Sequence, residues 1–273
     1  MKKNKSVFLS VPYILWMLAF TLIPLGVVGY YALTDPETGA FTWSNIQNLS
    51  MYLPVLGQSV VYALISALIC LVLGYPVAYY IAHRGPLAQK LLYMLVMLPM
   101  CMSFLLRTLA WVGLLQDTGI INNFLDAIGI GRLPLIRTPA AVILGMVYNY
   151  LPYMILPLYA TLVKLDNRLI EAAEDLGCRP VQTFSKVILP LSVPGILSGI
   201  TMVFVPAVST FYISQKLGGT DTVLVGDLIE RLFKQADNPN LGAALSLVLM
   251  ALVFVCTGIM NRFGDSEEGG VVV

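Results

Sequence analysis

Six long runs of apolar residues constrain this chain more than any other feature of its sequence. The runs are free of charge or nearly so, and they cover about residues 7–33, 57–82, 91–115, 138–163, 187–213 and 241–261. About 20 apolar residues in a helix cross the hydrocarbon core of a bilayer, and a helix satisfies its own backbone hydrogen bonds where water is absent. We therefore expect an all-α membrane protein with six transmembrane helices, built as one transmembrane domain over residues 1–273.

The composition supports this class and excludes others. Hydrophobic residues make up 58% of the chain and charged residues 11%, whereas soluble domains carry about 25% charged residues. The formal net charge of +1 provides no basic surface for a nucleic acid, so we expect no nucleic acid as a partner. The expected partner is the lipid bilayer. The four cysteines lie far apart, and His83 is the one histidine, so we predict no metal site and no cofactor in this chain.

The basic residues predict how the helices are oriented. With the N-terminus inside, most lysines and arginines fall in inner segments, whereas the first outer segment, 35–54, has none. The inner ones are Lys2, Lys3, Lys5, Arg84, Lys90, Lys164, Arg168, Arg179, Lys186 and Arg262. This asymmetry follows the positive-inside rule, so we expect both termini and the loop 164–186 to be cytoplasmic.

The loop between the fourth and fifth runs has the pattern of a short amphipathic helix. In KLDNRLIEAAEDLGCRPVQTFSKVILP (164–190), Asp166 or Asn167 can cap a helix, and Gly177 followed by Pro180 can end it. The apolar residues that share one face of this helix are Leu165, Leu169, Ala172, Ala173 and Leu176.

The same helix carries three carboxylates, on Glu171, Glu174 and Asp175. No histidine, metal ligand or nucleophile accompanies them, so a solvated acidic face is the simplest interpretation and no catalytic residue is predicted. A helix that merely lies on the lipid headgroups is the alternative.

The order of residues in this loop resembles the EAA motif, E-A-A-x3-G-x9-I-x-L-P, of the membrane subunits of ABC importers. The matching residues are Glu171, Ala172, Ala173, Gly177, Val187, Leu189 and Pro190, with Val187 where isoleucine is usual. The resemblance implies a type I ABC importer permease architecture in which this loop is the coupling helix that docks on an ATPase subunit. Small alanines allow close approach, Gly177 lets the chain turn left-handed, and Glu171 offers a charged hydrogen-bond acceptor.

The resemblance also implies the partners of the chain. An importer of this kind has a second related permease subunit, two ATPase subunits and an extracytoplasmic solute-binding protein, and it lies in the bacterial plasma (inner) membrane. ATP belongs to the ATPase subunits, and the sequence agrees because it contains no G-x-x-x-x-G-K-[ST] phosphate loop. The chain is therefore expected to be a transport subunit and not an enzyme.

Further strings resemble the PotB-type permeases of spermidine/putrescine importers. They are LVLGYPVAYY (71–80), LRTLAW (106–111), PAAVILGMVY (139–148), LPYMILP (151–157), PAVSTFYIS (206–214) and LGG (217–219). Relatives in this branch carry other solutes, so another solute is the alternative to a polyamine. Gln215 stands where an acidic residue is expected for the branch, and this departure disfavours a polyamine.

Polar and aromatic residues in the fourth and fifth runs are the candidates for a substrate path. They are Tyr148, Asn149, Ser209, Phe211 and Tyr212. Each cation–π contact with an amine would contribute about 0.5–2 kcal/mol. Tyrosine belts at the membrane interface explain the same residues equally well, so both interpretations stay open.

Two other classes of function are alternatives. An intramembrane protease needs a nucleophile and a base at bilayer depth, but the chain has no G-x-S-x-G and His83 lies at the end of a run. A secondary carrier should place acidic residues inside its spans, and the six runs hold none at mid-depth.

Arg107 is the one charge that intrudes on an apolar run. Because that run begins at Leu91, we expect Arg107 at the outer end of the third helix, with its side chain snorkelling to the interface rather than buried. In the fifth run, Pro190, Pro194 and Pro206 predict kinks.

Overall fold

A computed structural model describes residues 12–13, 15–35, 38–234 and 238–268. The regular elements in these ranges are helices, with one isolated bridge between Thr34 and Phe41, which confirms the all-α class. The predicted start of the first span at 7–11 and the basic residues at 2, 3 and 5 lie outside the described residues. The chain divides into two compact units, Met1–Pro54 with Leu228–Leu252 and Val55–Asp227 with Val253–Val273.

The described residues contain five helical segments that are long and apolar enough to cross a membrane, or six when one bent pair counts as a span. The segments are Leu15–Ala32, Ser44–Ala82, Phe104–Ala127, Pro139–Leu162 and Pro239–Met260, and the bent pair is Pro180–Leu191 with Val193–Val208. This number agrees with the prediction, while the third and fifth predicted spans have interruptions that the apolar runs do not reveal.

The predicted third span, 91–115, is two helices. α5 (Pro86–Met97) continues as the 3-10 turn η3 (Leu98–Cys101), and the chain is extended at Met102 and Ser103 before α6 (Phe104–Leu115) begins. Pro99 has no N–H with which to continue the α-helical ladder, so the helix tightens and ends there.

This interruption corrects the expectation for Arg107. The helix restarts at Phe104, so Arg107 lies in the first turn of α6, which contacts α8 and α13. Its side chain is buried instead of snorkelling: the residue is 7% exposed, and Nε and Nη1 have no hydrogen-bond partner within the part of the chain that the structure describes.

The predicted fifth span, 187–213, is bent and ends early. Pro180–Leu191 and Val193–Val208 meet at 63° around Ser192, with Pro190 and Pro194 on either side. The kink expected from these prolines is therefore present at this point, and the second half of the span ends at Val208.

The first unit is held by a polar junction at Thr34. Its carbonyl oxygen accepts hydrogen bonds from Asn45 Nδ2 (2.9 Å) and Asn240 Nδ2 (2.6 Å), and both asparagines are buried. The junction joins three parts of the unit that are far apart in sequence. The elements of this unit are η1 (Leu18–Leu22, a π-helical turn), α2 (Ile23–Ala32), α3 (Ser44–Gln47), η2 (Asn48–Tyr52), most of α14 (Val225–Lys234) and the first part of α15 (Pro239–Glu268).

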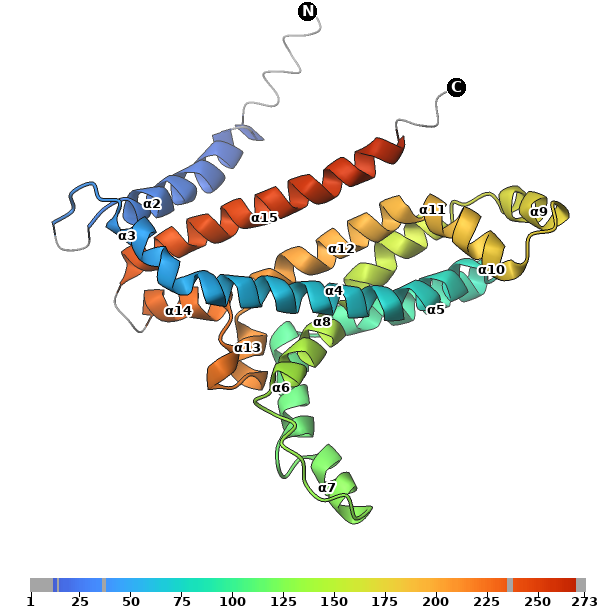
Figure 1. The fold of residues 1–273 in the computed structure, drawn as a ribbon, viewed down its shortest axis with the longest axis horizontal. Coiled ribbons are helices and arrows are strands. Elements are labelled where there is room, and N and C mark those ends of the chain that lie inside the picture. The colour runs from blue at the N-terminus through green and yellow to red at the C-terminus, as the bar shows by residue number, and fades with distance from the viewer. Residues whose placement is uncertain (1–11, 14, 36–37, 235–237, 269–273) are drawn as a thin grey trace, which may run out of the picture. The chain divides into compact units, whose positions relative to one another are not determined.

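The second unit is built around α8 (Pro139–Leu162) and α12 (Val193–Val208), which lie side by side (Figure 1). Gly195 and Gly199 bring α12 close to α8, and Gly74 of α4 (Leu53–Ala82) lies against Met154 of α8. Small residues allow such close approach between apolar helices. The remaining elements are α7 (Ile120–Ala127), α9 (Asn167–Asp175), α10 (Pro180–Thr183), η4 (Phe184–Ile188, a π-helical turn), α11 (Leu189–Leu191), α13 (Tyr212–Leu217) and η5 (Thr220–Thr222).

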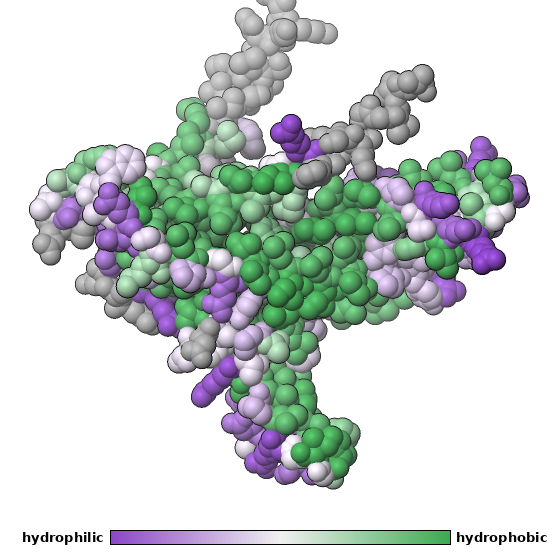
Figure 2. All heavy atoms as spheres, in the orientation of Figure 1, coloured by the Kyte–Doolittle hydropathy of each residue, from purple (hydrophilic) through white to green (hydrophobic). Residues whose placement is uncertain are grey.

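Different elements form the two ends of this unit. α9 and α10 lie beyond the C-terminal end of α8, whereas α6, α7 and α13 lie around its N-terminal end (Figure 1). On the face seen in Figure 2, hydrophilic side chains gather over α9 and α10, and hydrophobic ones cover the long helices. Exposed apolar side chains such as Leu68 and Val72 of α4 suit contact with lipid or with another apolar protein surface.

Candidate functional site

The loop that follows α8 is a well-capped helix and turn. The Asp166 side chain accepts a hydrogen bond from Arg168 N (3.0 Å), so Asp166, one of the two candidates from the sequence, is the N-cap of α9. At the other end Gly177 has φ of 83°, and the N–H groups of Gly177 and Cys178 donate to the carbonyls of Glu174 (2.8 Å) and Ala173 (3.0 Å). This pair of bonds is a Schellman motif, which needs a left-handed residue that glycine adopts without strain.

Several apolar side chains of the same loop are exposed to solvent. Ala173 is buried, but Leu169 and Leu176 of the predicted apolar face are exposed, as is Val181 at the start of α10. Leu176 is 86% exposed and Val181 77% exposed, so the fold of this chain covers little of either side chain. We call Leu169, Leu176 and Val181 the apolar loop patch, and its exposure indicates contact with another surface.

The carboxylates of α9 form no catalytic or metal-binding arrangement. Glu171, Glu174 and Asp175 are exposed. No group of His, Cys, Asp and Glu able to hold a metal ion occurs among the residues described. Glu171 and Ala172 are both exposed, and they lie on the same helix as Leu169 of the apolar loop patch.

The second part of the EAA pattern lies on the return to α12. Val187 is in η4, and Leu189 and Pro190 are in α11, so the pattern spans α9, its turn and the return. α9 contacts η4 and α10, which makes the loop one packed body.

Two of the candidate path residues, Tyr148 and Tyr212, face the same helix, α6. The ring of Tyr148 lies 5.4 Å from the ring of Trp111 at 72°, and the ring of Tyr212 lies 6.3 Å from that of Phe104. Tyr212 is also 5.7 Å from the Lys216 ammonium, centroid to Nζ. The structure thus brings residues of the fourth and fifth predicted spans together around an aromatic stripe on α6.

The other candidates are fixed by different contacts. Asn149 is buried, donates from Nδ2 to Gly145 O (2.9 Å), and its Oδ1 has no partner in the described structure. Ser209 is the C-cap of α12 and donates to Val205 O (3.2 Å), and Phe211 is the exposed N-cap of α13. Ser209 and Phe211 therefore lie at the break between α12 and α13.

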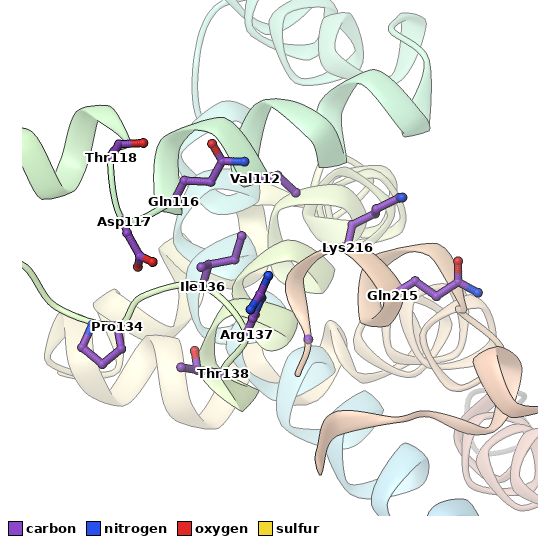
Figure 3. Close-up of a pocket in the computed structure, with 11 residues that line it drawn as sticks. Val112, Gln116, Asp117, Thr118, Pro134, Ile136, Arg137, Thr138, Gln215 and Lys216 are labelled. Atoms are coloured by element: carbon purple, nitrogen blue, oxygen red, sulfur yellow. The ribbon is translucent and has the colours of Figure 1, made fainter. Parts of the chain in front are cut away.

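A polar cavity of about 790 Å³ lies at the N-terminal end of α8, and the sequence patterns did not single it out (Figure 3). It is lined by Val112, Gln116, Asp117, Thr118, Pro134, Ile136, Arg137, Thr138, Gln215, Lys216 and Gly218. Arg137 is held there in a left-handed backbone conformation (φ of 61°), and its N–H donates to Leu217 O (2.9 Å). A non-glycine residue in this conformation stores strain of about 1–3 kcal/mol, a feature that concentrates at functional sites.

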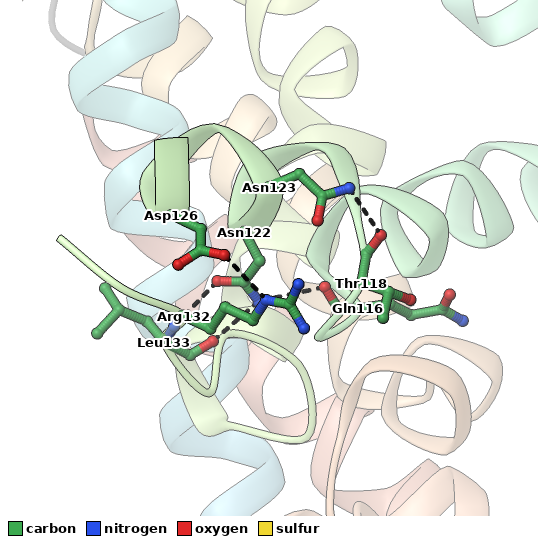
Figure 4. Close-up of polar contacts among 7 residues, drawn as sticks. All are labelled: Gln116, Thr118, Asn122, Asn123, Asp126, Arg132 and Leu133. Carbon is green, nitrogen blue, oxygen red and sulfur yellow. Dashed lines mark hydrogen bonds and ion pairs between the residues drawn. The ribbon is translucent and has the colours of Figure 1, made fainter. Parts of the chain in front are cut away.

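The segment beside this cavity is fixed by buried amide contacts (Figure 4). Asn122 Nδ2 donates to the carbonyls of Gln116 (3.2 Å) and Leu133 (3.0 Å), and Asn122 Oδ1 accepts from Leu133 N (3.0 Å). At the surface, Arg132 Nε lies 3.6 Å from Asp126 Oδ2. The rim of the cavity is therefore a defined structure and not a loose loop.

Gln215, where an acidic residue was expected, has a carboxylate beside it. Its Nε2 donates to Asp227 Oδ1 (2.9 Å), and Asp227 is almost fully buried. An acidic group is thus present next to this wall of the cavity, supplied by α14 instead of α13.

Comparison with known proteins places these features in a family. Residues 71–266 match the family described as binding-protein-dependent transport system inner membrane component. The chain is 40% identical over 268 residues to the spermidine/putrescine transport system permease protein PotB of Haemophilus influenzae, covering 92% of this chain and 94% of that one. PotB of Escherichia coli strain K12 is 38% identical over 243 residues, 86% of this chain and 88% of that one.

A solved structure has the same fold. A chain of the bacterial alginate ABC transporter, in complex with an alginate pentasaccharide-bound periplasmic protein, superposes with a TM-score of 0.81 over 96% of this chain and 94% of that chain. The identity is 17%, so this likeness shows the fold alone.

Proposed function

Because the chain belongs to the family of binding-protein-dependent transport system inner membrane components, and is thus an ABC importer permease of the bacterial inner membrane, we propose that it forms half of the translocation path for a polyamine, spermidine or putrescine. The observation that carries the choice of solute is the 38–40% identity to two spermidine/putrescine permeases over most of both chains. Identity at this level over 86–92% of the chain makes a shared solute class the simplest expectation.

The loop after α8 is the proposed contact with a separate ATPase subunit. The apolar loop patch supplies the area to bury, Ala172 allows close approach, and Glu171 supplies a charge-assisted acceptor beside it. ATP is bound and hydrolysed on the partner, because this sequence has no phosphate loop. Closure of the ATPase pair then moves the loop and, through it, the helices of the second unit.

The remaining partners are a second, related permease subunit, two ATPase subunits in all, and an extracytoplasmic solute-binding protein. The family description and the periplasmic protein bound to the alginate transporter support the last of these. With the loop 164–186 on the cytoplasmic side and both termini inside, the polar cavity at the opposite end of α8 faces outward and can receive a delivered solute.

The aromatic stripe on α6 suits a cationic solute. Tyr148 with Trp111, and Tyr212 with Phe104, present ring faces and edges along one helix, and a desolvated amine gains about 0.5–2 kcal/mol from each ring it stacks on. The buried carboxylate of Asp227, beside Gln215 at the wall of the cavity, adds a negative group near the start of this route.

An anionic solute of the same importer class is the second candidate, and specific residues favour it. Among the described lining residues of the cavity, Arg137 and Lys216 are basic and Asp117 is acidic, and α6, which supplies Val112 to the lining, also carries the buried Arg107. Two lining cations would repel a polyamine and attract a carboxylate or phosphate.

Uptake by the assembled importer tests both candidates. The assay uses proteoliposomes that contain the chain, its partner permease and the ATPase. ATP is supplied on the side of the ATPase, and the binding protein is added with radiolabelled spermidine, putrescine or citrate on the other side. We expect ATP-dependent accumulation of the two polyamines, at least about tenfold reduced in Glu171→Ala because one charge-assisted contact is lost. Glu174→Ala, on the same exposed helix but outside the EAA pattern, is the matched control and should retain uptake.

The alternative outcomes are distinct. Accumulation of citrate without polyamine would replace the first candidate by the second. Transport driven by a sodium or proton gradient in vesicles that lack the ATPase would exclude both and indicate a secondary carrier.

A further inference from the structure

The return from the loop to α12 is fastened to α4 by aromatic contacts. The ring of Phe184, in η4, lies 5.6 Å from the ring of Tyr75 at 87° and 6.1 Å from the ring of Tyr79 at 83°. Edge-to-face pairs at these distances add about 0.5–1.5 kcal/mol beyond burial of their area. Phe184 thus joins the loop body to two successive turns of α4.

A buried hydrogen bond lies beside this aromatic contact. Tyr75 Oη and Ser192 Oγ are 2.8 Å apart, and Ser192 Oγ also lies 2.9 Å from Leu189 O. The serine has one hydroxyl proton, which goes to the Leu189 carbonyl, so Tyr75 is the donor in the contact between the two hydroxyls. Tyr75 is 8% exposed and Ser192 is 0% exposed, so the bond joins two buried residues.

Ser192 is the residue at which the fifth span bends. Pro180–Leu191 and Val193–Val208 meet there at 63°, and the Ser192 N–H is shared between the carbonyls of Ile188 (3.0 Å) and Leu189 (3.1 Å). The backbone is therefore satisfied by weak local bonds on the loop side. The bond from Tyr75 ties Ser192 itself to a different helix, α4.

The bend is followed at once by close packing on α8. A β-carbon at Gly195 would lie 2.6 Å from Thr161 Oγ1, so α12 and α8 touch within one turn of Ser192. A displacement of the loop body that is transmitted through a stiff bend would move α12 and α8 together. If the bend were compliant, the same displacement would be absorbed at Ser192.

We propose that Tyr75 is a positioning residue that stiffens the bend at Ser192, so that movement of the α9–η4 loop body is passed to α12 and α4 as one motion. This proposal rests on the proposed function, since it assumes that an ATPase moves the loop. It differs from the docking role of Glu171, because Tyr75 and Ser192 are buried behind the loop and leave the apolar loop patch unchanged.

The test is the number of ATP molecules hydrolysed per solute transported in the reconstituted importer, measured for Tyr75→Phe, Ser192→Ala and the double variant. We expect each single variant to keep the ATPase bound and active, to keep the KM for solute, and to lower maximal uptake about fivefold or more, which raises the ratio. The double variant should be no worse than either single one, since both remove the same bond.

Tyr79→Phe is the matched control. It lies one turn from Tyr75 and keeps its ring contact with Phe184, and its hydroxyl forms no hydrogen bond with another described residue, so its ratio should equal the wild-type ratio. An unchanged ratio in both single variants would overturn the proposal, as would additive losses in the double variant. If Tyr75→Phe fails to insert, Ser192→Ala decides alone.

Failure of the proposed function would look different. The ratio is measured with whichever of spermidine, putrescine and citrate the wild type accumulates, so a wrong solute leaves the comparison intact. Loss of ATPase binding in Glu171→Ala with a normal ratio in Tyr75→Phe would keep the docking role and reject the positioning role.

Discussion

Gly199 of α12 packs directly against Met154 of α8: a β-carbon added to Gly199 would lie 2.6 Å from the Met154 sulfur and 3.3 Å from the Met154 carbonyl oxygen. Gly195, one turn earlier, is equally close to Thr161 of α8. Two glycines four residues apart therefore form the face on which α12 meets α8, an arrangement that lets apolar helices approach at backbone distance.

Substitution at this contact should loosen the second unit. We expect Gly199→Ala to lower the free energy of unfolding in detergent by about 1–3 kcal/mol, because Met154 must leave its position and the backbone carbonyl cannot. Thermal unfolding followed by circular dichroism measures this. The control is Gly258→Ala in α15, where a β-carbon would meet nothing within 4 Å, and there the helix should gain up to about 1 kcal/mol. Equal stability of Gly199→Ala and wild type would show that α8 and α12 are not this tightly packed.

The stability of the turn after α9 should depend on the backbone conformation of Gly177 and not on steric room for a side chain. Gly177 has φ of 83° and open surroundings, so Gly177→Ala should cost about 1–2 kcal/mol of local stability through its left-handed backbone alone. Gly177→Asn should cost less, since asparagine tolerates this region. Hydrogen exchange at the Gly177 and Cys178 amides and ATP-driven uptake are the measurements. Gly85→Ala, also in open surroundings but with φ of −65°, should change neither.

The polar junction of the first unit should be sensitive to loss of one donor. Asn240→Ala removes a buried bond to the Thr34 carbonyl and should lower the free energy of unfolding by about 1–3 kcal/mol. Asn123→Ala removes an exposed bond of the same type, from Nδ2 to Thr118 O, and water can replace it, so that variant should stay within about 0.5 kcal/mol of wild type. Chemical unfolding of the two variants side by side gives the comparison, and equal losses would contradict the burial of Asn240.

Arg107 should behave as a buried charge without a local partner. Arg107→Met keeps an unbranched apolar stem of about the length of the arginine methylenes and removes the unpartnered Nε and Nη1, so the free energy of unfolding of the isolated chain should rise by about 1–3 kcal/mol. Arg132→Met, at an exposed 3.6 Å ion pair, should change it by less than about 1 kcal/mol. A lower free energy of unfolding for Arg107→Met would contradict this prediction, because it would show that the guanidinium makes stabilising contacts in the folded chain.

Local features of this protein could be predicted from its sequence because neighbouring residues decide them. The apolar runs predicted helices at the membrane-spanning segments, since lipid requires only length and composition. The Asp166 cap, α9 and the left-handed turn at Gly177 also follow from a few adjacent residues and are present as expected. The EAA pattern singled out the same loop through spacing alone.

Tertiary structure decided what these helices touch. Arg107 is buried because the chain is extended at Met102 and Ser103, which restarts the helix against α8, and an apolar run gives no sign of that restart. The cavity around Arg137 and the hydrogen bond between Tyr75 and Ser192 each join residues that are tens to more than a hundred positions apart. Hydrophobic periodicity specifies that a face is apolar, but in a membrane protein nearly every face is apolar. Which face meets which helix is therefore decided by shape, through small residues such as Gly195 and Gly199, and by the few buried polar groups that must find partners.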